Sequence, residues 1–204
     1  MIERSTPGAL RALSVYSGAG GLDRAALAAG VEVVALCEAD PFCRRLLAVR
    51  FPGVPIYESD TTLTADRLAA DGIGRIDLVF GGPPCQPASS AGKRLGASDP
   101  RWRWPEYFRL VRDLRPRWVV AEQPPGILSL HGGRPWAWVQ DQLDALGYRV
   151  GWSCYGADAV GAPHRRERVF LLASLADADG SQPQRAGSVG RLAGAPGDGA
   201  DHGG

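Results

Sequence analysis

The sequence has a single lysine, few cysteines, almost no net charge and no long apolar run. Its 204 residues carry a net charge of +1, so contacts with nucleic acid would have to come from local clusters of basic residues. Lys93 is the single lysine, a bias that we ascribe mainly to a G+C-rich coding sequence. No apolar run approaches the roughly 20 residues that span a bilayer, and residues 1–10 lack a signal-peptide pattern. These absences predict a soluble, intracellular protein.

Cysteine is scarce, and none of it has the CxxC spacing of a metal or redox motif. The four cysteines are Cys37, Cys43, Cys85 and Cys154. We therefore expect free thiols in a reducing compartment.

The composition is that of a globular domain, with 22% charged and 45% hydrophobic residues. We expect one domain over residues 1–175. Residues 176–204 are rich in glycine, alanine and aspartate and show no periodicity, which predicts a linker or a disordered tail.

Short apolar segments alternate with segments of helical periodicity along this domain. We expect strands over residues 9–16, 31–37, 55–57, 76–80, 117–121, 149–155 and 169–173. We expect helices over residues 22–29, 41–51, 63–71, 106–114 and 136–146. This alternation predicts an α/β fold with a doubly wound, mostly parallel sheet.

Polar or glycine-rich positions follow five of the predicted strands, at the sheet edge where open α/β folds bind ligands. They are the glycine turn at residues 18–21, Glu38, Asp60, residues 83–85 and Glu122. The glycine turn is not a dinucleotide fingerprint, because Asp23 stands where the third glycine is required. Glu38 lies about 20 residues beyond Gly18, where a carboxylate can bind both ribose hydroxyls. Asp60 could bind an adenine amine or, equally, cap the helix that follows it.

Cys85 lies between two prolines and Gln86-Pro87, directly after a predicted buried strand. A thiol held at a strand end, near arginines and free backbone N–H groups, is a candidate nucleophile. The other three cysteines lie in apolar stretches and are expected to pack as small apolar side chains. A zinc nucleobase deaminase would need an H-x-E motif and a further cysteine just downstream, and neither is present. No metal site is therefore expected.

Four segments occur in a recognisable order: Ser-Gly-Ala-Gly-Gly-Leu at residues 17–22, Gly-Pro-Pro-Cys-Gln-Pro at residues 82–87, Glu122, and Gly-Ala-Pro-His-Arg-Arg-Glu-Arg at residues 161–168. Over residues 10–173 the chain resembles the catalytic half of the DNA (cytosine-5)-methyltransferases. The resemblance implies the Rossmann-like fold of S-adenosylmethionine-dependent methyltransferases. It also implies S-adenosyl-L-methionine as cofactor and a cytosine flipped out of double-stranded DNA as substrate. Such an enzyme would be cytoplasmic, prokaryotic or phage-encoded, and held at the nucleoid through DNA.

The resemblance assigns four residues to the base. Cys85 would add to C6 of cytosine, Glu122 in a protonated form would bind N3 and the exocyclic amine, and Arg168 would hold O2. Arg166 would contact phosphate and the loop at residues 89–103, which would close over the base. Arg165 is expected at the surface.

The resemblance assigns a second set of residues to the cofactor. Tyr16 and Asp60 would lie at the adenine, Glu38 at the ribose and the glycine turn at the methionine moiety. The residues so implied are Tyr16, Gly18, Gly20, Gly21, Leu22, Glu38, Asp60 and Pro83.

The chain departs from the family pattern without losing a catalytic group. Gln123-Pro124 replace Asn-Val, His164 replaces a glutamine, Ala88 replaces a common aromatic residue, and Ala39 offers adenine no ring. The family's target-recognition domain and last motif do not follow residue 173. Three functions stay open: a DNA methyltransferase half that is truncated or works with a second polypeptide, a tRNA cytosine-5 methyltransferase, and a non-catalytic binder of cofactor or nucleic acid.

Overall fold

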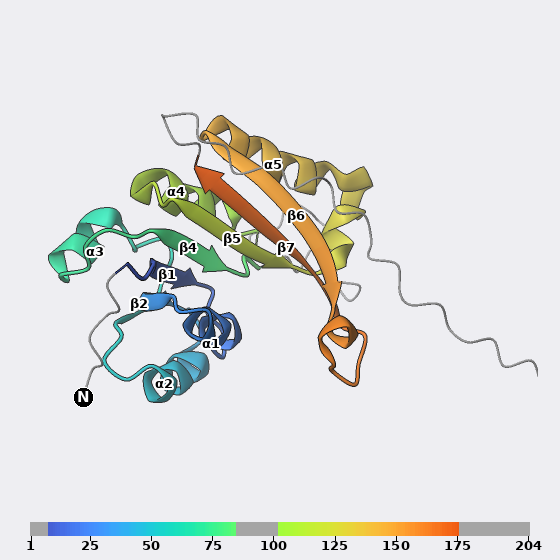
Figure 1. Cartoon of the computed structure of the whole chain (residues 1–204). Coiled ribbons are helices and arrows are strands. Elements are labelled where there is room, and N and C mark those ends of the chain that lie inside the picture. The colour runs from blue at the N-terminus through green and yellow to red at the C-terminus, as the bar shows by residue number, and fades with distance from the viewer. Residues whose placement is uncertain (1–7, 85–101, 176–204) are drawn as a thin grey trace, which may run out of the picture.

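Within the described residues, seven strands form one sheet in the order β3-β2-β1-β4-β5-β7-β6 (Figure 1). The computed structural model describes residues 8–84 and 102–175. The strands are β1 Arg11–Val15, β2 Glu32–Cys37, β3 Ile56–Tyr57, β4 Leu78–Gly81, β5 Trp118–Gln123, β6 Tyr148–Gly156 and β7 Glu167–Leu175. All seven predicted strands are present, and their ends lie close to the predicted ones.

The pairing divides the sheet into a parallel and an antiparallel part. β1 pairs in parallel with β2 and β4, β3 pairs in parallel with β2, and β5 pairs in parallel with β4. β7 lies between β5 and β6 and is antiparallel to both. The prediction of a doubly wound, mostly parallel sheet is therefore confirmed, and the position of β7 inside the sheet is what the structure adds.

The helices are α1 Gly21–Ala28, α2 Pro41–Arg50, α3 Ala65–Ala70, α4 Trp104–Leu114 and α5 Arg134–Ala145. Local sequence explains where α2 and α3 begin. The side chain of Asp40 accepts a hydrogen bond from the Cys43 N–H at 2.8 Å before α2. The side chain of Thr64 accepts one from the Arg67 N–H at 3.1 Å before α3.

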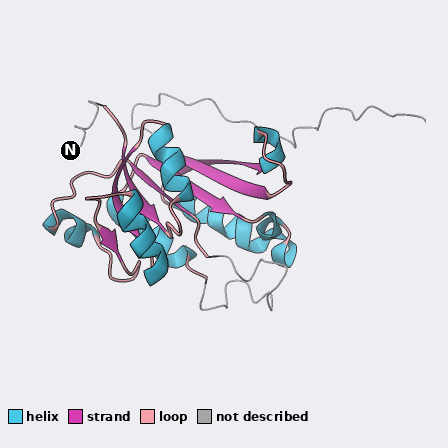
Figure 2. Ribbon diagram, turned by 90° about the horizontal axis from the view of Figure 1, so that it is seen from below, coloured by secondary structure: helices cyan, strands magenta, loops and turns pink. Residues whose placement is uncertain are grey.

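The helices cover both faces of the sheet (Figures 1 and 2). Leu22 and Ala26 of α1 and Leu47 of α2 pack in a smaller apolar cluster on one face. α3, α4 and α5 pack in a larger cluster on the other face. Alternation along the strands explains the split, because Ala12 belongs to the smaller cluster and Leu13 to the larger.

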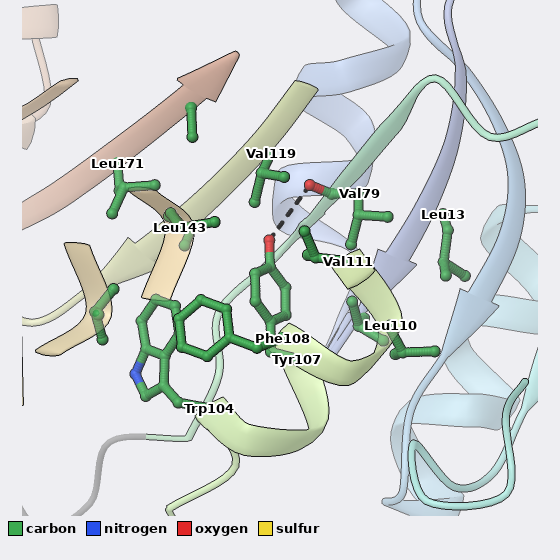
Figure 3. Close-up of a cluster of buried hydrophobic side chains, with 14 of the residues drawn as sticks. Leu13, Val79, Trp104, Tyr107, Phe108, Leu110, Val111, Val119, Leu143 and Leu171 are labelled. Carbon is green, nitrogen blue, oxygen red and sulfur yellow. Dashed lines mark hydrogen bonds between the residues drawn. The ribbon is translucent and has the colours of Figure 1, made fainter. Parts of the chain in front are cut away.

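Helix α4 forms the centre of the larger cluster (Figure 3). Trp104 and Tyr107 are fully buried there, and the Tyr107 hydroxyl donates a hydrogen bond to the Val120 carbonyl of β5 at 2.9 Å. Burial raises the pKa of Tyr107, so the hydroxyl stays a donor. This bond holds α4 against the strand that ends at the candidate site.

The close approach of β1 and β4 requires a glycine. A Cβ atom on Gly81 would overlap the carbonyl oxygen of Val15. Sequence reasoning ended the preceding strand at residue 80 and treated this position as part of a turn, but Gly81 is paired with Val15 in the sheet. Within the described ranges, three short 3₁₀ helices were not predicted: η3 Pro125–Leu128, η4 Leu130–Gly133 and η5 Ala157–Val160.

Some predictions fall on residues outside the described ranges. Cys85, residues 89–101 of the predicted loop and the predicted tail at residues 176–204 are among them. Within residues 8–84 and 102–175, none of the helices has the length and apolar character needed to cross a membrane.

Candidate active site

The ends of β1, β2 and β3 bring the first group of predicted residues together. The Gly18 N–H donates to the Glu38 carboxylate at 2.7 Å, and the Glu38 N–H donates to the Tyr57 carbonyl at 2.9 Å. The Tyr16 hydroxyl donates to the Asp60 carboxylate at 2.8 Å. Tyr16, the glycine turn, Glu38 and Asp60 thus meet at one sheet edge, and we call this set the β1–β2 half of the site.

The glycine turn needs glycine at two of its positions. Gly18 has a φ of +54° and Gly20 a φ of +81°, in the left-handed region that favours glycine. A Cβ atom on Gly20 would also lie 2.8 Å from a ring carbon of Phe51. Leu22, predicted as a cofactor residue, packs its side chain against the smaller apolar cluster.

Glu38 connects two turns through its carboxylate. One oxygen accepts the Gly18 N–H at 2.7 Å and the other accepts the Asp40 N–H at 2.8 Å. An ionised carboxylate has about four lone-pair positions, so roughly two remain for a ligand. The side chain is half-buried, and its backbone bonds fix the direction in which those positions point.

Asp60 is held by side chains from two distant segments. In addition to the Tyr16 hydroxyl, Nε and Nη2 of Arg103 donate to it at 2.9 and 2.6 Å. About one acceptor position therefore remains on this carboxylate. Asp60 is not a helix cap, because α3 begins at Ala65 and is capped by Thr64. The sequence offered no signal for Arg103 beyond its place in an Arg-Trp-Arg-Trp run.

Tyr16 is partly buried and has a strained backbone conformation. Its φ of +57° lies in the left-handed region, which costs free energy for a side chain with a Cβ atom. Burial and the neighbouring Asp60 raise the pKa of the Tyr16 hydroxyl, which therefore remains a hydrogen-bond donor.

Asp23 lies in the first turn of α1 and is fully buried. Burial raises the pKa of its carboxyl, and neither carboxylate oxygen has a hydrogen-bond partner among the described residues. A buried acid at this helix N-terminus disfavours a phosphate group nearby, as the departure from the dinucleotide fingerprint predicts.

The ends of β5 and β7 bring a second group together, which we call the β5–β7 half of the site. Glu122 and Arg168 form an ion pair in which both side chains are about one-quarter exposed, at 24% and 26%. The antiparallel register explains this pair, since Glu122 lies opposite Phe170, two residues from Arg168. Sequence reasoning placed Glu122 after the strand, whereas it lies inside β5.

The segment that leads to Cys85 lies against the same strand. A Cβ atom on Gly82 would lie 3.1 Å from a Glu122 carboxylate oxygen, so the Gly82 backbone passes close to that side chain. The Gln123 amide donates to the Pro83 carbonyl at 2.8 Å. Pro83, predicted as a cofactor residue, is thus held at the β5–β7 half.

Arg165 and Arg166 precede β7 and are exposed. Arg165 lies 4.0 Å from Asp158 with 92% of its side chain exposed, as expected for a surface residue. The Arg166 carbonyl accepts the Ala157 N–H at 3.0 Å, which joins this segment to η5. Arg166 is two residues from Arg168 in the sequence, but it is Arg168 that forms the ion pair with Glu122.

A family model of C-5 cytosine-specific DNA methylases matches residues 10–188. The chain belongs to this family. It is 34% identical over 173 residues to the type II methyltransferase M.AquIA of Picosynechococcus sp., covering 78% of this chain and 70% of that one. It is 33% identical over 171 residues to M2.BsuMI of Bacillus subtilis, covering 81% of this chain and 42% of that one.

Solved structures agree with this membership. A protein of an E. coli prophage, described as a DNA modification methyltransferase, superposes with a TM-score of 0.69 at 28% identity, covering 82% of this chain and 47% of that one. A Spodoptera frugiperda DNMT2 structure superposes with a TM-score of 0.68 at 21% identity, over 87% of this chain and 53% of that one, which shows the fold. The methyltransferase fold implied by the resemblance is confirmed, and the chain spans about half the length of most of these relatives.

Proposed function

We propose that this chain carries the catalytic half of an enzyme that transfers a methyl group from S-adenosyl-L-methionine to C5 of cytosine in double-stranded DNA. The observation that carries the proposal is the β5–β7 half of the site. There the Glu122–Arg168 pair lies against the Gly82-Pro83 segment that runs directly into Cys85. The proposed protein works in the cytoplasm, on DNA, together with a second polypeptide or a further segment that reads the target sequence.

The β1–β2 half fits S-adenosylmethionine. Positions 18 and 20 of the turn carry no side chain, and Glu38 and Asp60 retain acceptor positions for hydroxyl and amine donors. Asp23 lies next to the turn in the first turn of α1, where an acidic residue suits a ligand without a pyrophosphate better than a dinucleotide. Glu38 would hold the ribose hydroxyls and Asp60 the adenine amine. When bound, the cofactor supplies an electrophilic methyl group.

The β5–β7 half offers the groups that a cytosine ring needs during attack at C6. Addition of the Cys85 thiolate to C6 makes C5 nucleophilic and sends negative charge towards N3 and O2, so both atoms need donors or positive charge. N3 and O2 are neighbours on the ring, and Glu122 and Arg168 are neighbours in the structure. Glu122 would carry a proton to N3 and bind the exocyclic amine, while Arg168 would hold O2. After methyl transfer to C5, a base (we propose water) removes the C5 proton, Cys85 leaves C6 as a thiolate, and the N3 proton returns to Glu122.

Trapping of the covalent intermediate tests this proposal. DNA duplexes containing 5-fluorocytosine block the last proton removal, so the protein with S-adenosylmethionine should give a DNA adduct that survives denaturing electrophoresis. Cys85→Ala should abolish the adduct and leave cofactor affinity nearly unchanged. Cys43→Ala, a half-buried thiol in α2, is the matched control and should be trapped like the wild type.

Three outcomes would contradict the proposal. An adduct with tRNA and not with duplex DNA would indicate an RNA enzyme. Absence of any adduct, even with a polypeptide that carries target recognition, would indicate a non-catalytic binder. Loss of cofactor binding in Cys85→Ala would remove the thiol from the role of nucleophile.

A further inference from the structure

Arg103 makes contacts to which the assignments above give no role. It lies directly before α4, between Trp102 and Trp104, which are both buried in the larger apolar cluster. The two indole rings lie 6.4 Å apart and fix the backbone on either side of the arginine. The Arg103 side chain meanwhile reaches Asp60 in the β1–β2 half of the site. The core therefore anchors an arginine at the candidate cofactor site.

Asp60 is bound from α4 at both its side chain and its backbone. Arg103 donates from Nε to one carboxylate oxygen at 2.9 Å and from Nη2 to the other at 2.6 Å. Arg109, further along α4, donates to the Asp60 carbonyl and, at 3.0 Å, to the Leu63 carbonyl. Two arginines thus restrict both the position of Asp60 and the rotation of its carboxylate.

Among the described residues, each contact of the Asp60 carboxylate comes from a hydrogen-bond donor. The Tyr16 hydroxyl is the third donor, at 2.8 Å, and burial raises the pKa of Tyr16, so the hydroxyl keeps its proton. The Asp60 side chain is only 12% exposed, so little of it can meet a ligand. A ligand group at this carboxylate must itself donate a hydrogen bond, since a carbonyl oxygen would bring a second acceptor against it.

The Arg103 contact also restricts which purine Asp60 can bind. Adenine carries a donor, its exocyclic amine, at C6, whereas hypoxanthine carries an acceptor there and a donor at the neighbouring N1. A carboxylate without its guanidinium partner can turn and accept the N1–H of hypoxanthine. With both oxygens bound by Arg103, that turn would break two charge-assisted hydrogen bonds.

We propose that Arg103 is a positioning residue that makes the site select a 6-aminopurine over a 6-oxopurine, by holding Asp60 as a fixed acceptor for the exocyclic amine. This inference rests on the proposed function, since the purine concerned is that of S-adenosyl-L-methionine. It adds to the cofactor site a residue that the Arg-Trp-Arg-Trp run alone gave no reason to choose.

The test compares two ligands by calorimetry: S-adenosylhomocysteine and S-inosylhomocysteine, in which hypoxanthine replaces adenine. The wild type should bind the adenine ligand about 100-fold more tightly, because hypoxanthine sets an acceptor against the carboxylate. Arg103→Met keeps a long side chain and removes the donors. It should weaken S-adenosylhomocysteine by about 10- to 100-fold and S-inosylhomocysteine by less than about threefold, so the preference largely disappears.

Two further variants identify the route of the effect. Asp60→Asn should also lose the preference, and adding Arg103→Met to it should change the ratio of the two affinities by less than about twofold, because Arg103 acts through Asp60. Arg75→Met is the matched control, since Arg75 donates to the buried Asp77 carboxylate before β4, away from this edge of the sheet. It should leave the ratio unchanged. All affinities are expressed per folded molecule, from circular dichroism.

The outcomes separate this inference from the proposed function. Equal weakening of both ligands by Arg103→Met would overturn the positioning role, because a general loss of structure affects both purines alike. A wild type that binds both ligands equally would overturn it as well, and in either case the proposed function would stand. Absence of S-adenosylhomocysteine binding by the wild type would overturn the proposed cofactor, and this inference with it.

Discussion

The two halves of the site hold their carboxylates in different ways. In the β1–β2 half, Glu38 is bound by two backbone N–H groups and Asp60 by a tyrosine hydroxyl and a two-bond contact with Arg103. In the β5–β7 half, Glu122 is paired with the Arg168 guanidinium at a partly exposed position. The first half thus holds its carboxylates through several donors and leaves a few acceptor positions open, whereas the second half holds Glu122 through one partly exposed ion pair.

This difference matches what the proposed function requires of each half. A group that binds an unchanging ligand gains from donors that set its direction in advance. A group that meets charge developing during a reaction must exchange its partner for the substrate. The parallel strands place backbone N–H groups near Glu38, while the antiparallel β7 brings an arginine side chain to Glu122.

The largest effect is expected in the β5–β7 half, from Glu122→Gln. The amide cannot transfer a proton to N3, so methyl transfer should slow by about 10²- to 10⁴-fold, the usual contribution of general acid–base catalysis. Transfer of labelled methyl groups to DNA measures the rate. S-adenosylhomocysteine affinity should be unchanged, and an equal fall in that affinity would mean that the two halves do not act separately. Glu106→Gln, in a pair with Arg109 on α4, is the control.

Glu38→Ala should have the next largest effect, and in the opposite half. Removal of this carboxylate leaves ribose hydroxyls without an acceptor, which costs about 1–3 kcal/mol of cofactor affinity by calorimetry. Glu58→Ala is a matched control, because Glu58 is 75% exposed and lies 4.0 Å from Arg44. Equal affinities for wild type and Glu38→Ala would remove Glu38 from the cofactor site.

Arg103→Gln tests how much the ion pair between Arg103 and Asp60 contributes to the stability of the fold. Loss of the two-bond contact with a partly buried carboxylate should lower the free energy of unfolding by about 1–2 kcal/mol. Urea denaturation measures the loss. Arg112→Gln removes an exposed pair with the adjacent Asp113 and should change stability by less than about 0.5 kcal/mol. Similar losses in the two variants would show that Arg103 contributes no more than a surface residue.

The smallest effect concerns the pH dependence of stability at Asp23. Burial raises the pKa of this carboxyl in the folded state, so the folded protein binds more protons there than the unfolded chain. The contribution of Asp23 to stability is therefore full below its unfolded pKa of about 3.9 and is lost as the pH rises through the folded pKa. Asp23→Asn should reduce the fall in stability between pH 4 and pH 7 in urea titrations. An unchanged pH profile would show that Asp23 ionises as it does in the unfolded chain.

Local patterns predicted the elements well, because each strand and helix is encoded by its own apolar spacing and turn residues. The glycines at positions 18 and 20 and the Asp40-Pro41 start of α2 act within a few residues of themselves. The strand ends near Glu38 and Asp60 followed from the same patterns. The strand before Glu122 was predicted to end at residue 121, two residues short of the end of β5 at Gln123, since a strand end is set by pairing with a neighbour.

The contacts made across the fold could not be predicted in this way. Asp60 read equally well as a helix cap, and only the structure brings Arg103, 43 residues away, to its carboxylate. The antiparallel insertion of β7 between β5 and β6 sets the Glu122–Arg168 pair, and the end of β5 sets the Gln123–Pro83 bond. Each of these depends on strand order and register.

The sequence by itself therefore determined the α/β class, the approximate positions of the strand ends and the residue types that gather there, because these are properties of short stretches of chain. The tertiary structure decided which side chains form hydrogen bonds or ion pairs with one another. It made Asp60 part of a framework, paired Glu122 with Arg168, and fastened Pro83 to Gln123. The physical reason is that a hydrogen bond between distant residues exists only once strand pairing has brought its donor and acceptor to the same edge of the sheet.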